Sequence, residues 1–266
     1  MNFVCPKCRE PLFVSDGGTA KCKNNHSYDR ARQGYYNLLL TSVGGTHGDN
    51  LEMVEARRDF LDTGAYLPLA KRISLLLRKY ARGPRVLDVG CGEGYYTDII
   101  LAENPALSVS AFDISRDAVK HAAKRNKGLA LAVAGAYDMP VADGSFDVVL
   151  NMFSPLVPAE VHRALDEGGI FIMAVPGEEH LFALKSATYK TPYKNELSDS
   201  ALDGFSLLHT ERLTYELRLD EPEKIRTLFM MTPYAYRTRK EDRERVLSLK
   251  ELATEVDFVI FVYKKA

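Results

Sequence analysis

The chain has 266 residues, four cysteines and a formal net charge of −1 at pH 7. This length allows a sizeable buried core, the near-neutral charge excludes a global basic field, and four cysteines are too few for a disulfide framework. No apolar run approaches the roughly 20 residues of a membrane span and the first residues carry no signal-peptide pattern, so we expect a cytoplasmic protein without membrane contact.

Four residues of types that bind metals lie within the first 36 residues, which we predict to form a separate module. Cys5, Cys8, Cys22 and His26 follow the spacing Cys-x2-Cys-x13-Cys-x3-His, and two close pairs of such ligands suit tetrahedral zinc. Four protein ligands close the site, which makes it structural, and zinc supplies the stability that a module this small lacks. The alternative is a set of free cysteines beside an incidental histidine, and His47 is the other histidine near enough in sequence to serve.

The same module is basic and contains interleaved tyrosines. Residues 5–36 hold six lysines and arginines against three acidic residues, a balance of +3. Cationic and aromatic side chains on a zinc module suit contacts to the phosphates and stacked bases of RNA. An ordinary solvated face with a few core tyrosines is the alternative.

Residues 37–82 are interpreted as a linker followed by two helices. A glycine-rich run at 43–50 is typical of a flexible connection. The Asp-Asn pair that ends it offers a side-chain cap for a helix over 51–62. Apolar residues at helical spacing predict a second helix from 67 to about 80.

Residues 83–266 alternate between strand and helix patterns. Strands are expected at 86–90, 107–113, 129–134, 146–151 and 170–175, with helices at 94–103, 115–125 and 158–165. Further β-like runs follow at 204–208, 214–219 and 258–263, with a helix at about 222–230. This alternation predicts an α/β domain with a parallel sheet, helices on both faces, and a ligand site beyond the carboxyl ends of the strands.

A glycine-rich turn follows the first of these strands, in the sequence Asp88-Val-Gly-Cys-Gly-Glu-Gly94. Three glycines at this spacing let a nucleotide approach the backbone closely. The pattern differs from the dinucleotide fingerprint and is similar to the S-adenosylmethionine (SAM) site of class I (Rossmann-like) methyltransferases. We expect the turn to lie under the methionine part of SAM, with contacts from the residues Asp88, Gly90, Gly92, Glu93 and Gly94. An unrelated tight turn is the alternative, and Cys91 is interpreted as a small packed residue.

Two acids farther along the chain complete the predicted cofactor site. Asp113 closes the second strand about 20 residues beyond the turn, where a carboxylate accepts hydrogen bonds from both ribose hydroxyls. Asp138 follows the third strand and is placed to accept a hydrogen bond from the adenine amino group. An unrelated tight turn can explain the glycines alone. It is a much poorer explanation for the turn, Asp113 and Asp138 occurring together in this order.

With both halves in view, the chain resembles the bacterial 23S rRNA guanine-N1 methyltransferases over nearly its whole length. The resemblance rests on the zinc-ligand pattern, the glycine turn, Gly34-Tyr35-x-Asn37-Leu38-Leu39, Ala56-Arg57-Arg58-x-Phe60-Leu61-Asp62-x-Gly64-x-Tyr66, Pro176-Gly177-x-x-His180-Leu181 and Met231-Thr232-Pro233. It implies a zinc module that binds RNA and methylation of a guanine in a hairpin loop of 23S rRNA. It also implies SAM contacts by Tyr66, Gly92, Glu93 and His180, homodimers among the members, and an influence on macrolide-type antibiotic action in one branch.

The proposed chemistry assigns roles to the segment that follows the fourth strand. Guanine N1 carries a proton near neutral pH, so transfer requires its removal while the base, splayed out of its loop, is held in line with the sulfonium methyl. Asn151 is expected to orient the guanine edge, because an amide both donates and accepts. Phe153 is expected to stack on the base, with a core aromatic as the alternative. The segment 151–155 resembles the Gram-positive branch, which modifies a neighbouring guanine.

Arg57 and Arg58 are candidates to clamp a phosphate or the SAM carboxylate. Adjacent residues of a helix face different directions, so one of the two is expected to be solvated.

Two other functions stay open on the sequence alone. The first is a small-molecule methyltransferase in which the zinc module is a structural lid. The second is a non-catalytic RNA-binding protein that holds SAM as a structural ligand. Both are compatible with the same core, because a fold does not determine its substrate.

Overall fold

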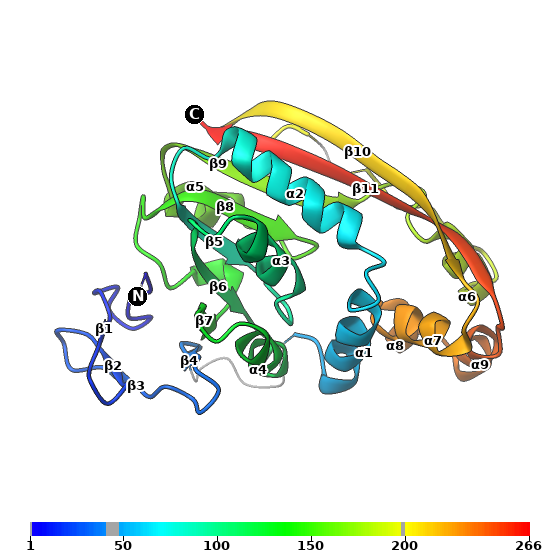
Figure 1. Cartoon of the computed structure of the whole chain (residues 1–266), viewed down its shortest axis with the longest axis horizontal. Coiled ribbons are helices and arrows are strands. Elements are labelled where there is room, and N and C mark those ends of the chain that lie inside the picture. Colours follow the sequence, from blue (N-terminus) through cyan, green and yellow to red (C-terminus); the bar gives the residue numbers. More distant parts are fainter. Residues whose placement is uncertain (1, 41–47, 198–199) are drawn as a thin grey trace.

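The computed structural model describes residues 2–40, 48–197 and 200–266. These residues form an α/β domain, built on one large twisted sheet, and a small β module formed by the N-terminal part of the chain (Figure 1). This is the predicted class I fold with its separate N-terminal module. Most of the predicted linker at 43–50, with His47 inside it, lies outside the described residues.

The N-terminal module is a three-stranded antiparallel sheet in the order β1-β2-β3. Its strands are β1 (Phe13–Val14), β2 (Ala20–Lys21) and β3 (Ser27–Tyr28). The turn between the first two has Gly18 at φ 81°, and its N–H donates to the Ser15 carbonyl at 2.8 Å. Strands of two residues bury little surface, so the module needs a further constraint to stay folded.

Eight strands of the described chain form the main sheet, in the order β10-β11-β9-β8-β5-β6-β7-β4. They are β4 (Tyr36–Asn37), β5 (Arg85–Val89), β6 (Ser108–Asp113), β7 (Ala130–Val133), β8 (Phe146–Met152), β9 (Leu165–Pro176), β10 (Phe205–Leu219) and β11 (Leu252–Lys265). The strands from β9 to β4 are parallel, whereas β10 and β11 form an antiparallel hairpin beside β9. The carboxyl ends of the parallel strands therefore meet at one edge, where ligands bind in such sheets.

Helices cover the sheet as the predicted alternation requires. They are α1 (Leu51–Leu61), α2 (Leu67–Tyr80), α3 (Tyr95–Glu103), α4 (Arg116–Arg125), α5 (Pro158–Ala164), α6 (Phe182–Thr188), α7 (Pro222–Met230), α8 (Tyr234–Arg237) and α9 (Lys240–Leu247), with a short 3-10 turn η1 (Ala136–Asp138). Figure 1 shows α7, α8 and α9 at the end of the molecule opposite the N-terminal module. None of the helices in the described ranges is long and apolar enough to cross a membrane.

Alternate residues of the central strands face two hydrophobic clusters. On β5, Val86 belongs to the cluster that contains buried residues of α2, α3 and α4, while Leu87 belongs to the cluster that contains those of α5 and the N-terminal module. Both side chains are fully buried, which explains why this strand reads as a continuous apolar run. Phe3 and Leu12 belong to the second cluster, so the N-terminal module covers part of one sheet face.

The hairpin at the sheet edge is longer than the sequence pattern predicts. The β-like runs at 204–208 and 214–219 belong to one strand, β10, which pairs with β11 along its length apart from an irregularity between Leu207 and His209. The middle of β10 is rich in half-exposed and exposed polar residues, so no apolar run marks it. Helices α6, α8 and α9 are also absent from the prediction, and α9 buries only Val246.

The N-terminal module joins the main sheet directly. Tyr36 and Asn37 form β4, which pairs in parallel with Ala132 and Val133 of β7. The sequence places the end of the module at residue 36, and in the structure this point is a strand of the methyltransferase sheet. Module and domain therefore share hydrogen bonds as well as core.

Candidate active site and metal centre

Four side chains of the N-terminal module converge on one point. The Sγ atoms of Cys5, Cys8 and Cys22 and a ring nitrogen of His26 all lie within 4.8 Å of one another. His26 Nδ1 is 3.4 Å from the sulfurs of Cys5 and Cys8 and 3.5 Å from that of Cys22, and the Cys8 and Cys22 sulfurs are 3.7 Å apart. Tetrahedral zinc implies edges of about 3.8 Å between sulfurs and about 3.5 Å between sulfur and nitrogen. The predicted ligands therefore fit zinc, and the chain has a Cys3His zinc-binding site.

Two tight turns hold these ligands. Arg9 follows the first cysteine pair at φ 62° and its N–H donates to the Cys5 carbonyl at 2.8 Å. Asn25 precedes His26 at φ 63° and donates in the same way to Cys22 at 3.0 Å. Tyr28 Oη lies 3.2 Å from the Cys5 sulfur, where it supports a thiolate ligand from outside the coordination sphere. The centre is closed and structural in character.

A cavity of about 540 Å³ opens at the carboxyl ends of the parallel strands. It collects residues that lie far apart in the sequence, from the glycine turn, α1, the end of β6, the segment after β8 and the segment after α7. Its lining includes Tyr66, Gly90, Gly92, Glu93, Asp113, Phe153 and His180. The structure therefore brings together seven of the eleven side chains and glycines that the sequence assigns to cofactor and substrate.

The glycine turn needs glycine for two different reasons. A Cβ at Gly90 lies 2.4 Å from Ser154 Cβ, and one at Gly94 lies 3.0 Å from Ala122 Cα, so close approach excludes a side chain there. At Gly92, φ is +56° and the nearest atom to an added Cβ is Arg57 Nη1 at 3.9 Å. Gly92 therefore presents bare backbone to an open space in the cavity, as a bound nucleotide requires.

Asp113 ties the turn to the second strand. One of its carboxylate oxygens accepts from Gly92 N–H at 2.9 Å and the other from Ser115 N–H at 2.8 Å. Burial raises the pKa of this carboxyl, and the two backbone donors oppose that effect. Each oxygen keeps a second lone pair, which leaves Asp113 able to accept the two hydroxyls of a ribose.

Tyr66 and His180 form a hydrogen-bonded pair in the cavity wall. Asp257 N–H lies 3.3 Å from His180 Nδ1, and His180 Nε2 lies 3.4 Å from Tyr66 Oη. Burial lowers the pKa of His180 to about 3, so the ring is neutral at pH 7. The backbone donor assigns the ring proton to Nε2, which donates to the Tyr66 oxygen. The Tyr66 hydroxyl hydrogen is then free to donate to a ligand.

Asp88 lies beneath the turn and outside the cavity lining. It is 2% exposed, and Thr97 Oγ1 donates to its Oδ2. Among the described residues its Oδ1 has no hydrogen-bond partner. Burial raises the pKa of Asp88 to about 6, an effect that the Thr97 hydrogen bond opposes.

The buried Asp88 carboxyl predicts a pH-dependent stability. Its pKa is higher in the folded state, about 6 against 3.8, so its stabilising contribution is complete below pH 4 and is lost as the pH rises through 6. Asp88→Asn removes this titration. As the pH rises from 4 to 7.5, we therefore expect the unfolding free energy of the variant, minus that of wild type, to increase by about 2–3 kcal/mol. Urea unfolding across this range measures the difference. Asp220→Asn, at an exposed acid, is the control, and a flat difference for Asp88→Asn contradicts the prediction.

Asp138, which the sequence assigns to the adenine amino group, pairs with an arginine of the N-terminal module. It lies outside the cavity lining, its side chain is 65% exposed, and its Oδ1 pairs with Arg9 Nη1 at 3.0 Å. Gly94 is also outside the lining and is the N-cap residue of α3.

Asn151 and Phe153 differ in their access to the cavity. Asn151 is 1% exposed and lies outside the lining, and its Nδ2 donates at 3.4 Å to the carbonyl of Pro155, which lines the cavity. Phe153 lines the cavity, is 39% exposed and has φ 59°. Its ring centroid is 5.3 Å from that of Phe258 and 6.2 Å from that of Tyr96. A non-glycine residue in this conformation is strained, which is typical of functional sites.

Two motifs that carry the sequence resemblance meet at the cavity. Arg57 of α1 and the Met231-Thr232-Pro233 segment after α7 both line it. Arg57 Nη2 donates to the Met231 carbonyl at 3.4 Å, and Nη1 pairs with Asp49. Asp49 also lines the cavity; sequence reasoning missed this acid except as a helix cap, because its contact with Arg57 is tertiary.

Comparison with known proteins identifies both halves of the chain. Residues 86–169 match the family model of a methyltransferase domain, and residues 3–41 match the zinc-ribbon model described as "RlmA, N-terminal". Among solved structures, a Bacillus halodurans C-125 protein described provisionally as a methyltransferase has a TM-score of 0.50 at 18% identity, covering 71% of this chain and 96% of that chain. A likeness at this identity shows the fold alone.

Two relatives match along nearly their entire length. The 23S rRNA (guanine(748)-N(1))-methyltransferase of Streptomyces fradiae is 32% identical over 96% of this chain and 95% of its own. A Bacillus subtilis (strain 168) protein with a provisional name as a 23S rRNA (guanine-N(1)-)-methyltransferase is 32% identical over 97% of this chain and 96% of its own. With its zinc ribbon, its glycine turn and its cavity, this chain belongs to the family of SAM-dependent 23S rRNA guanine-N1 methyltransferases.

Proposed function

We propose that this protein transfers a methyl group from SAM to N1 of a guanine in a hairpin loop of 23S rRNA. The observation that carries the proposal is the cavity of about 540 Å³ at the carboxyl ends of the strands, walled by the family's own motifs. Its volume lies within the range of small-molecule and cofactor sites. The Streptomyces fradiae relative, whose name specifies methylation at N1 of a 23S rRNA guanine, matches across both the ribbon and the domain.

The cavity residues suit the parts of SAM in order. SAM supplies a methyl group on a positively charged sulfur. The turn at 90–94 offers bare backbone to its methionine part, and Asp113 offers two acceptor oxygens to the ribose. Tyr66 offers a hydroxyl donor that the neutral His180 ring orients. The raised pKa of the buried Tyr66 keeps that hydroxyl protonated.

Arg57 is the residue we assign to the SAM carboxylate. Its side chain is 28% exposed and lines the cavity, with Nη1 3.9 Å from the position of a Cβ on Gly92. A guanidinium suits a carboxylate because its donors form a planar fork. Arg58 instead pairs with its neighbour Asp59 at 2.7 Å and lies outside the lining.

The two arginines therefore form a matched test. Arg57→Ala is expected to weaken SAM binding about 10- to 100-fold, because a hydrogen bond to a charged group contributes about 1.5–3 kcal/mol. Arg58→Ala is expected to change it by about twofold or less, since an exposed ion pair contributes little. Titration calorimetry with SAM measures both. Equal losses in the two variants contradict the assignment of Arg57.

Phe153 is the residue we place against the flipped guanine. Its exposed ring stands in the cavity beside Tyr96 and Phe258, where a base can stack on it. We place Asn151 behind Phe153 and not against the base. Its amide donates a hydrogen bond to the Pro155 carbonyl and so helps to fix the segment that carries Phe153. The Tyr66–His180 pair donates hydrogen bonds and does not take the N1 proton, because Nδ1 is already occupied by the Asp257 N–H.

The zinc ribbon offers a cationic surface for RNA. Lys7, Lys21 and Arg32 are exposed, and Phe13 at the first strand is 67% exposed. The tyrosines that suggested stacking are mostly structural, with Tyr35 and Tyr36 only 2% and 5% exposed. We therefore assign base stacking on the ribbon to Phe13 and phosphate contacts to the exposed cations.

Primer extension on rRNA tests the function most directly. Methylation at guanine N1 blocks Watson–Crick pairing, so reverse transcriptase stops before the modified base. We expect a stop at one hairpin guanine in wild-type rRNA and its loss in a deletion strain. Purified protein should transfer label from SAM to rRNA of that strain and not to a small-metabolite extract. A stop retained at every hairpin guanine in the deletion strain would falsify the proposal, and label in small metabolites favours the small-molecule alternative.

Two further properties follow from the resemblance and are proposed with it. We infer a homodimer, which sedimentation velocity at micromolar concentration tests. We also infer a change in susceptibility to macrolide-type antibiotics in the deletion strain, which growth in graded drug concentrations tests.

A further inference from the structure

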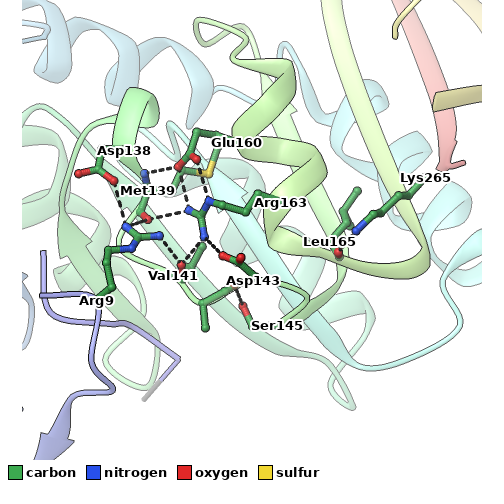
Figure 2. A network of polar contacts seen from close by, with 11 residues as sticks. Arg9, Asp138, Met139, Val141, Asp143, Ser145, Glu160, Arg163, Leu165 and Lys265 are labelled. Atoms are coloured by element: carbon green, nitrogen blue, oxygen red, sulfur yellow. Dashed lines mark hydrogen bonds and ion pairs between the residues drawn. The ribbon is translucent and has the colours of Figure 1, made fainter. Parts of the chain in front are cut away.

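Arg9 leaves the zinc ribbon and contacts the methyltransferase domain. Its Nη1 lies 3.0 Å from Asp138 Oδ1 and 2.8 Å from the Met139 carbonyl, and its Nη2 lies 2.9 Å from the Val141 carbonyl (Figure 2). One guanidinium from the ribbon therefore holds three acceptors of the loop 138–141. The side chain is 38% exposed, so the contacts lie at the rim of the interface.

The same loop is fixed from its other side by α5. Arg163 donates to the carbonyls of Val141 at 2.7 Å and Met139 at 3.0 Å, and Glu160 accepts from Met139 N–H at 2.7 Å (Figure 2). The ribbon adds a backbone bond from Val4 N–H to the Pro140 carbonyl at 2.7 Å. The carbonyls of residues 139, 140 and 141 therefore all accept hydrogen bonds. Those of Met139 and Val141 each accept from both Arg9 and Arg163.

This loop is joined by the short segment 134–137 to a wall of the cofactor cavity. It continues from η1 and β7, and Ala134 N–H donates to the Asp113 carbonyl at 3.0 Å. A Cβ on Gly135 would lie 3.9 Å from Ile114 Cδ1. Asp113 and Ile114 both line the cavity. A displacement of the loop is therefore expected to move this wall, which carries the Asp113 carboxylate that we assign to the ribose.

The zinc centre determines where Arg9 lies. Arg9 follows the ligand Cys8, and its backbone has φ 62° with its N–H bonded to the Cys5 carbonyl at 2.8 Å. A left-handed conformation is unfavourable for arginine and persists where the surroundings enforce it. Here the surrounding structure is the knuckle that Cys5 and Cys8 close around the metal. Loss of the metal releases this constraint.

We propose that Arg9 is a positioning residue that couples zinc occupancy of the ribbon to SAM affinity of the cavity. The coupling runs from the Cys5–Cys8 knuckle through Arg9 to the loop 138–141 and on to the Asp113–Ile114 wall. It rests on the proposed function only in taking SAM as the ligand. The ribbon then has a second role besides RNA contact, which is to hold the cofactor pocket in its binding geometry.

Equilibrium binding in the absence of RNA tests this proposal separately from methyl transfer. In full-length zinc-loaded protein, Arg9→Ala is expected to weaken SAM binding about 5- to 20-fold, within the usual range of coupling between sites. Zinc content should stay at that of wild type. Arg9→Lys should recover part of the loss, because an ammonium retains one of the contacts. Lys23→Ala is the matched control, because the Lys23 side chain pairs with Glu10 inside the ribbon at 2.8 Å, and this variant should bind SAM as wild type does.

The effect of SAM on zinc affinity is a second measurement, and it would be unaffected if Arg9 had only a structural role. If zinc strengthens SAM binding, SAM must strengthen zinc binding by the same factor. Competition with a chromogenic chelator should therefore show tighter zinc in wild type with saturating SAM than without it, and no such difference in Arg9→Ala. Unchanged SAM affinity in Arg9→Ala overturns the proposal, including the case in which only rRNA methylation falls. Absence of the SAM effect on zinc in wild type overturns it as well.

Discussion

Replacing Cys8 with serine is expected to abolish zinc binding and unfold the N-terminal ribbon while the methyltransferase sheet stays folded. Structural zinc contributes about 10–16 kcal/mol in small modules of this kind. The ribbon's own strands are two residues long each, so they cannot replace that contribution. Because misplacing a substrate by about 1 Å costs about 100-fold in rate, rRNA methylation is expected to fall by that factor or more.

Zinc analysis, limited proteolysis and methylation of unmodified rRNA measure the three parts of this expectation. Protease cuts should appear within residues 3–35 and not in the main sheet. Cys91→Ser is the matched control for zinc content, because Cys91 is the cysteine outside the metal centre and lies in the glycine turn. A Cys8→Ser protein that keeps its zinc and its protease resistance contradicts the assignment of the centre.

Replacing Gly90 with alanine is expected to weaken SAM binding about 30-fold or more. The added Cβ lies 2.4 Å from Ser154 Cβ and 2.6 Å from its Oγ, and φ at Gly90 is +71°. The hydroxyl of Ser154 donates to the Val89 carbonyl at 2.9 Å, so the serine cannot withdraw without losing that bond. The backbone strain costs about 1–2 kcal/mol, and the overpacking costs about 1–3 kcal/mol. To relieve the overlap, we expect the segment that carries Ser154 and Phe153 to be displaced.

Gly64→Ala isolates the backbone part of this effect. Gly64 has φ +81°, and an added Cβ there meets nothing within 4 Å. We expect it to lower stability by the strain alone and to leave SAM affinity near that of wild type. Calorimetric titration with SAM and thermal unfolding of both variants separate the two contributions. If Gly90→Ala binds SAM within about twofold of wild type, Ser154 is not the barrier that the geometry indicates.

Local spacing was enough to predict the zinc centre. Each ligand pair sits on a single tight turn, so its geometry depends on a few neighbouring residues. The same holds for the glycine turn, where the positive φ of Gly90, Gly92 and Gly94 is a local requirement. Helix α2 begins and ends at the predicted residues, because its apolar stripe is strongly periodic. The sequence pattern predicts two short strands in place of the long β10, because the exposed middle of an edge strand carries no apolar signal.

The sequence by itself determined the cofactor class, the metal centre and the order of strands and helices from β5 to β9, because these depend on residues close together in the chain. Only the tertiary structure decided which candidates reach the cavity. Arg57 faces it and Arg58 does not, because neighbouring residues on α1 point in different directions. Asp138 pairs with Arg9 across 129 positions of sequence. Such contacts arise from how the ribbon docks on the sheet, which no local pattern encodes.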